Sequence, residues 1–374
     1  MDRAAKRTRG LMTIPVYVPD LSGNERCYAE DAIGSGWISS IGPYVEKFES
    51  SLAREIGVPY AIAVSNGTVA LHLALHCLGV GPGDEVIVPT FTYIASVNAI
   101  AQTGATPVFV DSRASDWNLD ARDVERRITS ATKAIMPVHL YGMPCDPEIN
   151  ALARRHGLFV VEDCAEALGS YLGGKHVGAE ADVATFSFFG NKTVTTGEGG
   201  AVSASDPVLA ARLKKVKGQG QSLDRRYWHD ELGFNYRMTN ICAAIGTAQM
   251  ERLREILERK SRIAELYRDN LPSKYFTFQK GEANAKSSNW LVSVLLPPEC
   301  DRDQVMNELA ADGIDSRPVF YCAHHMPMYQ SPAIFPVAED IARRGLSLPS
   351  FPALSDEQVV EIGSKLTEIV SAHV

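Results

Sequence analysis

The feature that most constrains this chain is an alternation of short apolar runs with helical stretches, which starts near residue 52. The apolar runs are rich in strand-forming residues, and helical stretches of roughly 10–15 residues separate them. This alternation is typical of βαβ units, so the sequence predicts an α/β fold with a mostly parallel sheet. The runs are AIAVS (61–65), EVIVP (85–89), TPVFVD (106–111), KAIMPVHLYG (133–142) and LFVVEDCA (158–165), followed by VATFSFF (183–189) and GEGGAVSAS (197–205).

The C-terminal third of the chain has a different pattern. Residues 240–271 carry apolar side chains at helical spacing and dense charge between them, which predicts one long amphipathic helix that links two domains. Two strand-like runs, WLVSVLLP and SRPVF, flank a helical stretch at 301–311, and a final helix follows. This pattern predicts a smaller α+β domain. The predicted divisions are an N-terminal tail over 1–15, a large domain over 16–250 and a small C-terminal domain over 251–374.

Composition excludes several classes of protein. The 374 residues include 45 acidic and 37 basic side chains, for a net charge of −8, which argues against a nucleic-acid-binding surface. No run of 18 apolar residues occurs, so we expect no membrane span. The seven cysteines are scattered and form no C-x-x-C pair. We therefore expect a cytoplasmic protein without disulfides. We also expect no metal site, because the histidine pairs lack the carboxylate spacing that such a site needs.

One polar motif lies between a predicted strand and the helix after it. In SNGTVALHLAL, the backbone N–H groups of Gly67 and Thr68 would point out of the helix N-terminus. Such a terminus binds anions, because its first N–H groups are unpaired and the helix dipole is positive there. An ordinary N-cap at Thr68 explains the motif equally well.

Two further motifs lie at predicted strand ends. VVEDCAEALGS places Asp163 and Glu166 after a buried strand, where ligands bind in open α/β sheets. FSFFGNKTVTTGEGG places Ser187 and Lys192 on a strand-to-loop segment, with aromatic residues before Lys192 and a glycine-rich stretch after it. The alternative for Lys192 is a solvated loop lysine, but a lysine desolvated by aromatic neighbours has a lowered pKa and can attack an aldehyde. A phosphate-binding helix start, a strand-end aspartate and a pocket lysine are the three parts of a pyridoxal phosphate site.

These motifs, in this order, resemble the fold-type I pyridoxal-phosphate enzymes and specifically the DegT/StrS family of sugar-nucleotide aminotransferases. The similarity runs from about Val16 to the C-terminus and includes GWISS, GPGDEVIVP and GFNYRMTNICAAIG. Glu166 stands where many members of the family carry glutamine against the ring hydroxyl of the cofactor. The resemblance implies that Lys192 binds the cofactor covalently and moves protons, and that Asp163 pairs with the pyridine nitrogen. It also implies that Tyr93 stacks on the ring and that the phosphate is held by Gly67, Thr68 and Ser187. In a homodimer, the implied role of Asn235 is to reach the phosphate of the cofactor in the neighbouring subunit.

The resemblance also implies an activity. Family members that act as dehydratases carry histidine at the lysine position, so Lys192 favours transamination, and it also argues against a non-enzymatic regulator. The implied amino donor is L-glutamate. The implied acceptor is a nucleotide-linked 4-keto-6-deoxy sugar aminated at C4, with GDP preferred over dTDP or UDP. Candidate substrate residues are Trp37, Ser39, Arg225, Tyr227, Arg317 and Tyr321. Tyr227 and Tyr321 could equally pack at the domain interface.

Overall fold

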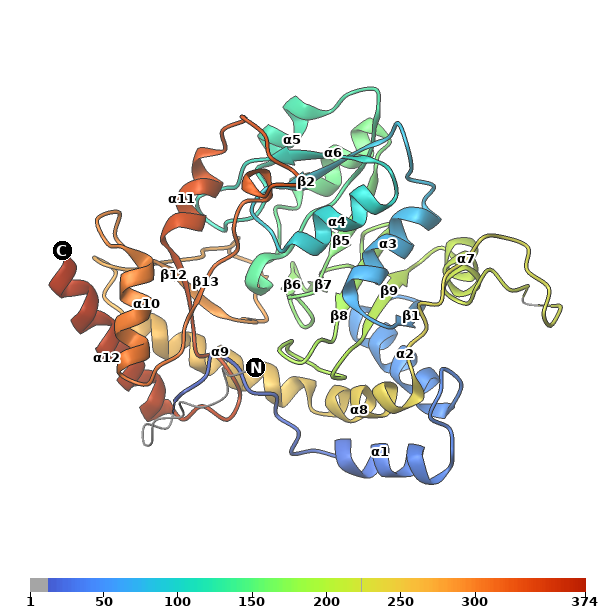
Figure 1. Ribbon diagram of the computed structural model, residues 1–374, viewed down its shortest axis with the longest axis horizontal. Coiled ribbons are helices and arrows are strands. Elements are labelled where there is room, and N and C mark those ends of the chain that lie inside the picture. The colour runs from blue at the N-terminus through green and yellow to red at the C-terminus, as the bar shows by residue number, and fades with distance from the viewer. Residues whose placement is uncertain (1–12, 223) are drawn as a thin grey trace, which may run out of the picture.

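The computed structural model describes residues 13–222 and 224–374, so most of the predicted tail over 1–15 lies outside the described residues. The chain forms a larger part around a seven-stranded sheet and a smaller part around a four-stranded sheet (Figure 1). Ile14 pairs with Ile314 of the smaller part in an isolated bridge. The segment just after the tail therefore contacts the C-terminal part of the chain.

The seven-stranded sheet confirms the predicted mostly parallel α/β architecture. Its strand order is β1-β9-β8-β5-β4-β2-β3, and only β9 runs antiparallel to its neighbours. Each apolar run identified in the sequence forms one of these strands. The strands are β1 (Tyr60–Val64), β2 (Glu85–Pro89), β3 (Thr106–Val110), β4 (Thr132–Ile135), β5 (Phe159–Asp163), β8 (Val183–Ser187) and β9 (Gly200–Ala204).

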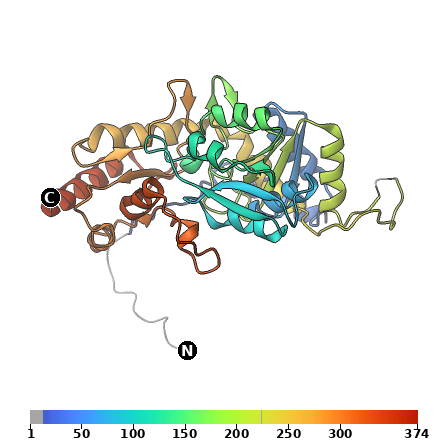
Figure 2. The same cartoon turned by 90° about the horizontal axis from the view of Figure 1, so that it is seen from above.

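Helices cover both faces of this sheet, which explains why its strands are apolar on both sides (Figure 2). Adjacent residues of one strand enter different cores: Ile62 packs against one helical layer and Ala63 against the other. One layer contains α3 (Gly67–Cys77), α4 (Ile94–Gln102) and α7 (Pro207–Lys217). The other contains α2 (Pro43–Ile56), α5 (Ala121–Arg127), α6 (Glu148–His156) and α8 (Asn240–Glu251).

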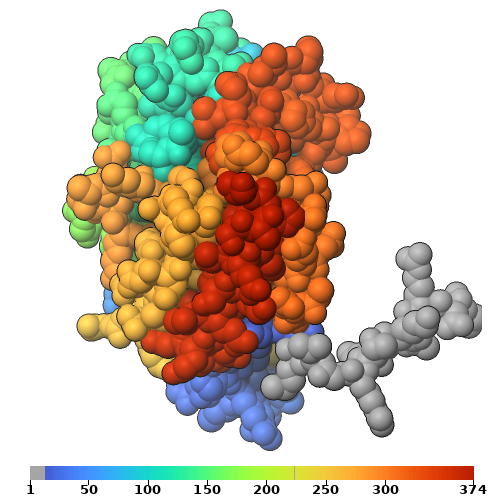
Figure 3. All heavy atoms as spheres, turned by 90° about the vertical axis from the view of Figure 1, so that its left-hand side faces the viewer, coloured from blue at the N-terminus to red at the C-terminus, as the bar shows by residue number. Residues whose placement is uncertain are grey.

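The smaller part is an antiparallel sheet covered by three helices. Its strand order is β10-β12-β14-β13. Figure 3 shows α12 lying between α9 and α10 on the outer surface, and the three helices enclose one apolar core with the sheet. Ser355 and Gln358 form a capping box at the start of α12. The elements are α9 (Leu253–Asn270), α10 (Arg302–Ala311), α12 (Asp356–His373), β10 (Thr277–Phe278), β12 (Val292–Leu295), β13 (Arg317–Pro318) and β14 (Gly345–Leu348).

The predicted single helix over 240–271 is two helices, α8 and α9, which meet at Arg252. The backbone of Arg252 leaves the helical region, with φ −105° and ψ 3°, and its guanidinium binds Asp20 at 3.0 Å. The two helices pack in different parts of the molecule, because α8 packs on α1 (Glu25–Gly34) and α2 whereas α9 packs on α12. The change of direction at Arg252 lets each helix follow its own packing partners.

Short elements complete the fold. A three-stranded sheet of order β11-β6-β7 joins the two parts, because β11 follows α9 in the chain and pairs with β6. No helix in the described ranges is long and apolar enough to span a membrane. The remaining elements are α1 (Glu25–Gly34), α11 (Pro336–Arg344), β6 (Tyr171–Leu172), β7 (Lys175–His176), β11 (Ala285–Lys286) and the 3-10 turns Leu140–Gly142 and Ala323–His325.

Candidate active site

A cleft of about 740 Å³ lies at the carboxyl ends of β5 and β8, where the smaller part meets the larger one. This is the edge at which ligands bind in open α/β sheets. The start of α3 and the loops after β2, β5 and β8 form one wall, and residues of the smaller part form the other. Residues that line the cleft include Gly67, Thr68, His72, Tyr93, Tyr141, Asp163, Glu166, Ser187, Lys192, Trp290, Arg317, Phe320 and Ser347.

Lys192 lies at the base of this cleft. Its ammonium nitrogen Nζ is 3.8 Å from Oε1 of Glu166 and 3.9 Å from the ring centre of Trp290. Burial of the side chain lowers the pKa of Lys192, although the negative charge of Glu166 opposes this effect. The amine is therefore closer to its neutral, nucleophilic form at neutral pH than an exposed lysine would be.

Glu166 is the buried acidic partner of this lysine. Its Oε2 accepts a hydrogen bond of 2.7 Å from the backbone N–H of Tyr141, which fixes the carboxyl group beside Lys192. Burial raises the pKa of Glu166 to about 7, and the positive charge of Lys192 opposes the rise. A carboxyl group with a raised pKa therefore lies beside an amine with a lowered pKa, and such a pairing is typical of sites that transfer protons.

Asp163 is the last residue of β5, and its side chain is held by two donors. Ser96 donates from Oγ to one carboxylate oxygen at 2.7 Å, and the backbone N–H of Ala165 donates to the other at 3.0 Å. Asp163 and Ser96 are both buried. These hydrogen bonds fix the orientation of the carboxyl group at the cleft wall.

The start of α3 provides free backbone donors beside Ser187. The side chain of Asn66 caps the helix by accepting from the N–H of Val69 at 3.0 Å. Within the described residues, the N–H groups of Gly67 and Thr68 donate to no other group. A Cβ atom on Gly67 would lie 2.8 Å from Cβ of Ser187, so only glycine lets the helix start approach β8 this closely. The arrangement is a compact anion cradle.

The cleft brings together many of the site residues predicted from the sequence. Asp163 at the end of β5, Glu166 in the loop after it and Lys192 in the loop after β8 line the same cleft. Tyr93 is 56% exposed, and its ring centre is 5.7 Å from that of Phe320. Arg317 is the predicted substrate residue that lines the cleft. The predicted residues that line it are Gly67, Thr68, Tyr93, Asp163, Glu166, Ser187, Lys192 and Arg317.

The other predicted residues lie outside the cleft of a single chain. Asn235 is exposed and accepts a hydrogen bond from Arg237 at 3.0 Å. Tyr227 is 78% exposed on the loop between α7 and α8, which projects from the molecule in Figure 1. Tyr321 lies under the guanidinium of Arg302. The predicted residues outside the cleft are Trp37, Ser39, Arg225, Tyr227, Asn235 and Tyr321.

Three aromatic residues that the sequence reading missed form a stack along the cleft. The ring of Tyr141 stacks on Trp290 with centres 6.0 Å apart, and on Phe320 with centres 5.3 Å apart. The three residues come from segments widely separated in the chain, so no local motif marked them. The stack forms an apolar wall beside Lys192.

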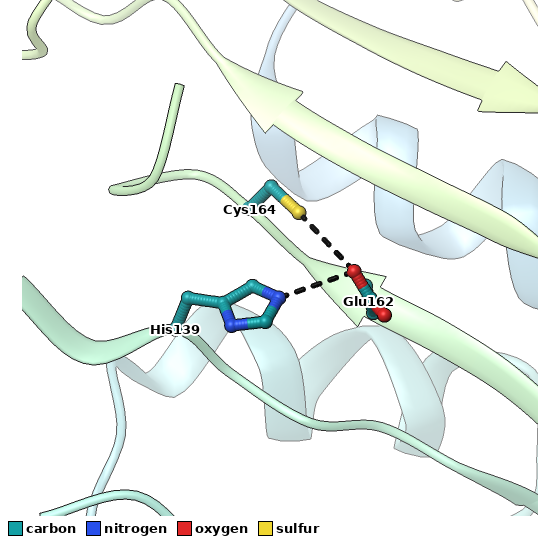
Figure 4. Close-up of side chains that lie close together, drawn as sticks. All are labelled: His139, Glu162 and Cys164. Atoms are coloured by element: carbon teal, nitrogen blue, oxygen red, sulfur yellow. Dashed lines mark hydrogen bonds and ion pairs between the residues drawn. The ribbon is translucent and has the colours of Figure 1, made fainter. Parts of the chain in front are cut away.

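A second buried cluster lies on the opposite face of β5, because Glu162 alternates with Asp163 along the strand (Figure 4). Oε2 of Glu162 is 3.2 Å from Nε2 of His139 and 4.0 Å from Sγ of Cys164. The backbone N–H of Gly178 donates to the same oxygen. Although burial raises the pKa of Glu162, the hydrogen bond and charge of His139 outweigh it, and the pKa is lowered. Hydrogen bonds within the protein therefore satisfy this carboxylate.

Comparison with known proteins identifies the family. Residues 19–367 match the DegT/DnrJ/EryC1/StrS aminotransferase family. The chain is 53% identical to GDP-perosamine synthase of Escherichia coli O157:H7, with 96% of this chain and 99% of the relative covered. It is 49% identical to GDP-perosamine synthase of Vibrio cholerae, with 93% and 97% covered.

Solved structures agree with this match. The PLP-form of the putative sugar aminotransferase Spr1654 from Streptococcus pneumoniae has a TM-score of 0.92 and 29% identity, and 97% of this chain and 100% of that chain are covered. S. venezuelae DesV has a TM-score of 0.89 and 36% identity, with 95% and 99% covered. These matches confirm the predicted fold and the predicted cofactor, pyridoxal phosphate. The chain is an aminotransferase and belongs to the DegT/DnrJ/EryC1/StrS aminotransferase family.

Proposed function

We propose that this aminotransferase moves an amino group from L-glutamate to C4 of GDP-4-keto-6-deoxymannose and so forms GDP-perosamine. Three relatives carry the proposal, and each is described as GDP-perosamine synthase. They are 46–53% identical to this chain over 93–96% of its length. The chain retains Lys192, the residue that transamination requires. The main alternative is amination of a dTDP- or UDP-linked keto sugar.

The donor groups of the cleft fit pyridoxal phosphate, and we propose the same contacts that the sequence predicted. The free N–H groups of Gly67 and Thr68 and the nearby Ser187 suit a phosphate. The buried, doubly hydrogen-bonded carboxylate of Asp163 suits a protonated pyridine nitrogen. Lys192 offers an amine of lowered pKa to the aldehyde. Tyr93 would cover the ring, and Glu166 would lie toward its hydroxyl group.

Lys192 carries the proton transfers in this proposal. Pyridoxal phosphate, when bound, supplies an electron sink for the bonds at the α-carbon of the amino donor. Nζ of Lys192 in its neutral form accepts the proton from that α-carbon, and burial keeps this form accessible at neutral pH. Glu166, 3.8 Å away, balances the charge that Lys192 gains. The stacked rings of Tyr141, Trp290 and Phe320 give these groups an apolar wall on one side.

The substrate side of the cleft supports an anionic ligand. Arg317 lines the cleft and forms no ion pair with a carboxylate of the described residues. Its guanidinium is suited to a diphosphate or a donor carboxylate.

We propose that a homodimer completes the site, with Asn235 at the phosphate of the partner's cofactor. In the same proposal, Trp37, Ser39, Arg225, Tyr227 and Tyr321 contact the nucleotide sugar.

We also propose a cytoplasmic location. All seven cysteines are free, and five of them are buried. Buried thiols without disulfides are typical of proteins kept in a reducing compartment. A nucleotide sugar and glutamate as substrates agree with this location.

Replacing Gly67 with alanine should weaken cofactor binding. The added Cβ would lie 2.8 Å from Cβ of Ser187 and push the helix start away from the strand end. We expect a destabilisation of about 1–3 kcal/mol and a rise of about tenfold in the Kd for pyridoxal phosphate. Thermal unfolding and cofactor titration measure both effects. Gly34→Ala is the matched control, because its Cβ would meet nothing within 4 Å; equal cofactor affinity in the two variants would contradict the cradle.

A substrate panel tests the proposed function. Purified enzyme with L-glutamate should aminate GDP-4-keto-6-deoxymannose with a higher kcat/KM than the dTDP- and UDP-linked 4-keto-6-deoxy sugars, with products identified by mass spectrometry. A preference of more than about tenfold for either alternative nucleotide corresponds to ~1.4 kcal/mol of transition-state discrimination and would overturn the GDP assignment. A dehydrated product without nitrogen would indicate dehydratase chemistry instead, and no product from any sugar would favour a regulator.

A further inference from the structure

Lys260 on α9 is a buried lysine that the reaction described above does not use. Its side chain is 1% exposed, and no carboxylate of the described residues lies within ion-pair distance of it. Its Nζ donates to two backbone carbonyl oxygens, those of Trp290 and Ser350, each at 2.9 Å. The same nitrogen is 5.3 Å from the ring centre of Tyr17. Burial lowers the pKa of Lys260 to about 7.

The groups around Lys260 belong to segments that hold the reactive lysine. The indole Nε1–H of Trp290 donates to the carbonyl oxygen of Asn191 at 2.7 Å. The hydroxyl of Tyr17 donates to the carbonyl oxygen of Lys192 at 2.5 Å. Two neighbours of Lys260 therefore bind two successive peptide groups of the Lys192 loop.

Trp290 is the direct link between the two lysines. Its backbone N–H donates to the carbonyl oxygen of Tyr141 at 3.1 Å, its indole N–H binds Asn191, and its carbonyl oxygen accepts from Lys260. Two of these hydrogen bonds hold the backbone of Trp290, and the third holds its indole ring. In that position the ring centre is 3.9 Å from Nζ of Lys192, close enough for the ring face to stabilise the protonated amine.

Lys260 does more than fill space at this place, because its Nζ pairs two backbone carbonyl oxygens. Taking an ammonium group out of water costs several kcal/mol, and an apolar side chain of similar length would avoid that cost but leave both oxygens without this donor. The two carbonyl oxygens offset part of the cost only because Nζ reaches both of them. One of these oxygens belongs to the residue against which Lys192 rests.

We propose that Lys260 is a positioning residue that fixes Trp290 and, through its indole ring, the protonation state of the Lys192 nitrogen that binds the cofactor. The inference rests on Lys192 as the cofactor-binding residue, but it is independent of which nucleotide sugar is aminated. Its test reads the bound cofactor directly. Failure of the sugar assignment therefore leaves this test unaffected.

The test records the absorption spectrum of bound pyridoxal phosphate as a function of pH in three holoenzyme variants. The quantity compared is the pH at which the spectral change is half complete, called the midpoint below. Lys260→Met should lower the midpoint by about half a pH unit or more, a threefold change in the acid dissociation constant, because a displaced ring stabilises the protonated form less. Trp290→Phe should lower it in the same direction. The double variant should shift it no further than the larger single shift, because both changes act through one contact.

Tyr267→Phe is the matched control. Tyr267 is on the same helix, is fully buried, and donates to the carbonyl oxygen of Pro349, next to Ser350. Its loss should reduce thermal stability as the loss of one buried hydrogen bond does, and should leave the midpoint unchanged.

Several outcomes would overturn the proposal. An unchanged midpoint in Lys260→Met with reduced stability would assign Lys260 a structural role only. An unchanged midpoint in Trp290→Phe would exclude action through the ring. Additive shifts in the double variant would exclude a shared path. If Lys260→Met does not fold, Lys260→Gln, which keeps an N–H donor without the charge, takes its place in the same comparison.

Discussion

Replacing Lys192 with alanine should abolish amination, with kcat falling by about 10³-fold or more. The variant loses both the amine that binds the cofactor covalently and the base that moves the proton at the donor's α-carbon, and general acid–base catalysis alone contributes about 10²–10⁴-fold. The purified wild-type protein should be yellow, and borohydride treatment should leave a phosphopyridoxyl group on Lys192. Peptide mass spectrometry and the glutamate-dependent amination assay measure both parts of the prediction.

The control for this variant is an exposed lysine. Lys175 on β7 is 65% exposed and pairs with Glu180 at the surface, so Lys175→Ala should keep wild-type colour and turnover. Thermal unfolding should show that Lys192→Ala remains folded, because a buried lysine is replaced by a smaller apolar residue at the cleft wall. Undiminished turnover in Lys192→Ala, or a borohydride label on another lysine, would refute the catalytic assignment.

The larger sheet was predictable because each of its strands carries its own signal. Parallel strands covered on both faces are continuous apolar runs, and these runs stand out between the helices that flank them. Gly345–Leu348 was missed because β14 is four residues long, with GLSL as its sequence, and directly follows α11. The break at Arg252 was missed for a different reason. Apolar spacing continues across it, and the different packing partners of α8 and α9 are tertiary features.

The candidate site divides in the same way. Gly67, Asp163 and Lys192 each stand next to a strand that the pattern identifies, so their approach at one sheet edge follows from topology. Trp290 and Ser96 had no such signal. Trp290 enters the cleft from the smaller part, and Ser96 lies on α4, where its hydroxyl bonds Asp163. Contacts between distant segments depend on how the parts pack together, which periodicity does not encode.

The predicted role of Asn235 distinguishes a shared site from a site within one chain. In the described structure Asn235 is exposed and does not line the cleft of its own chain. The loop that precedes it carries the exposed side chains of Tyr227, Trp228 and Leu232. Exposed apolar groups clustered in this way are typical of a protein–protein contact. In the proposed homodimer, we expect each Asn235 to reach the other subunit's cleft.

Mixing two inactive variants should therefore restore activity. Asn235→Ala should lose cofactor and turn over poorly at limiting pyridoxal phosphate, and Lys192→Ala should not turn over. In a hybrid dimer, one site carries both lesions and the other carries neither. With random exchange of equal amounts, half of the dimers are hybrid, so about a quarter of wild-type sites should return. The mixture is unfolded partially and refolded together, then assayed with limiting cofactor. Wild-type mixed with Lys192→Ala calibrates recovery after refolding, because half of its sites are active whatever the extent of exchange, and native mass spectrometry of the test mixture counts the hybrid dimers. Activity that stays at the sum of the separate variants despite proven exchange, or a fully active monomer, would refute the shared site.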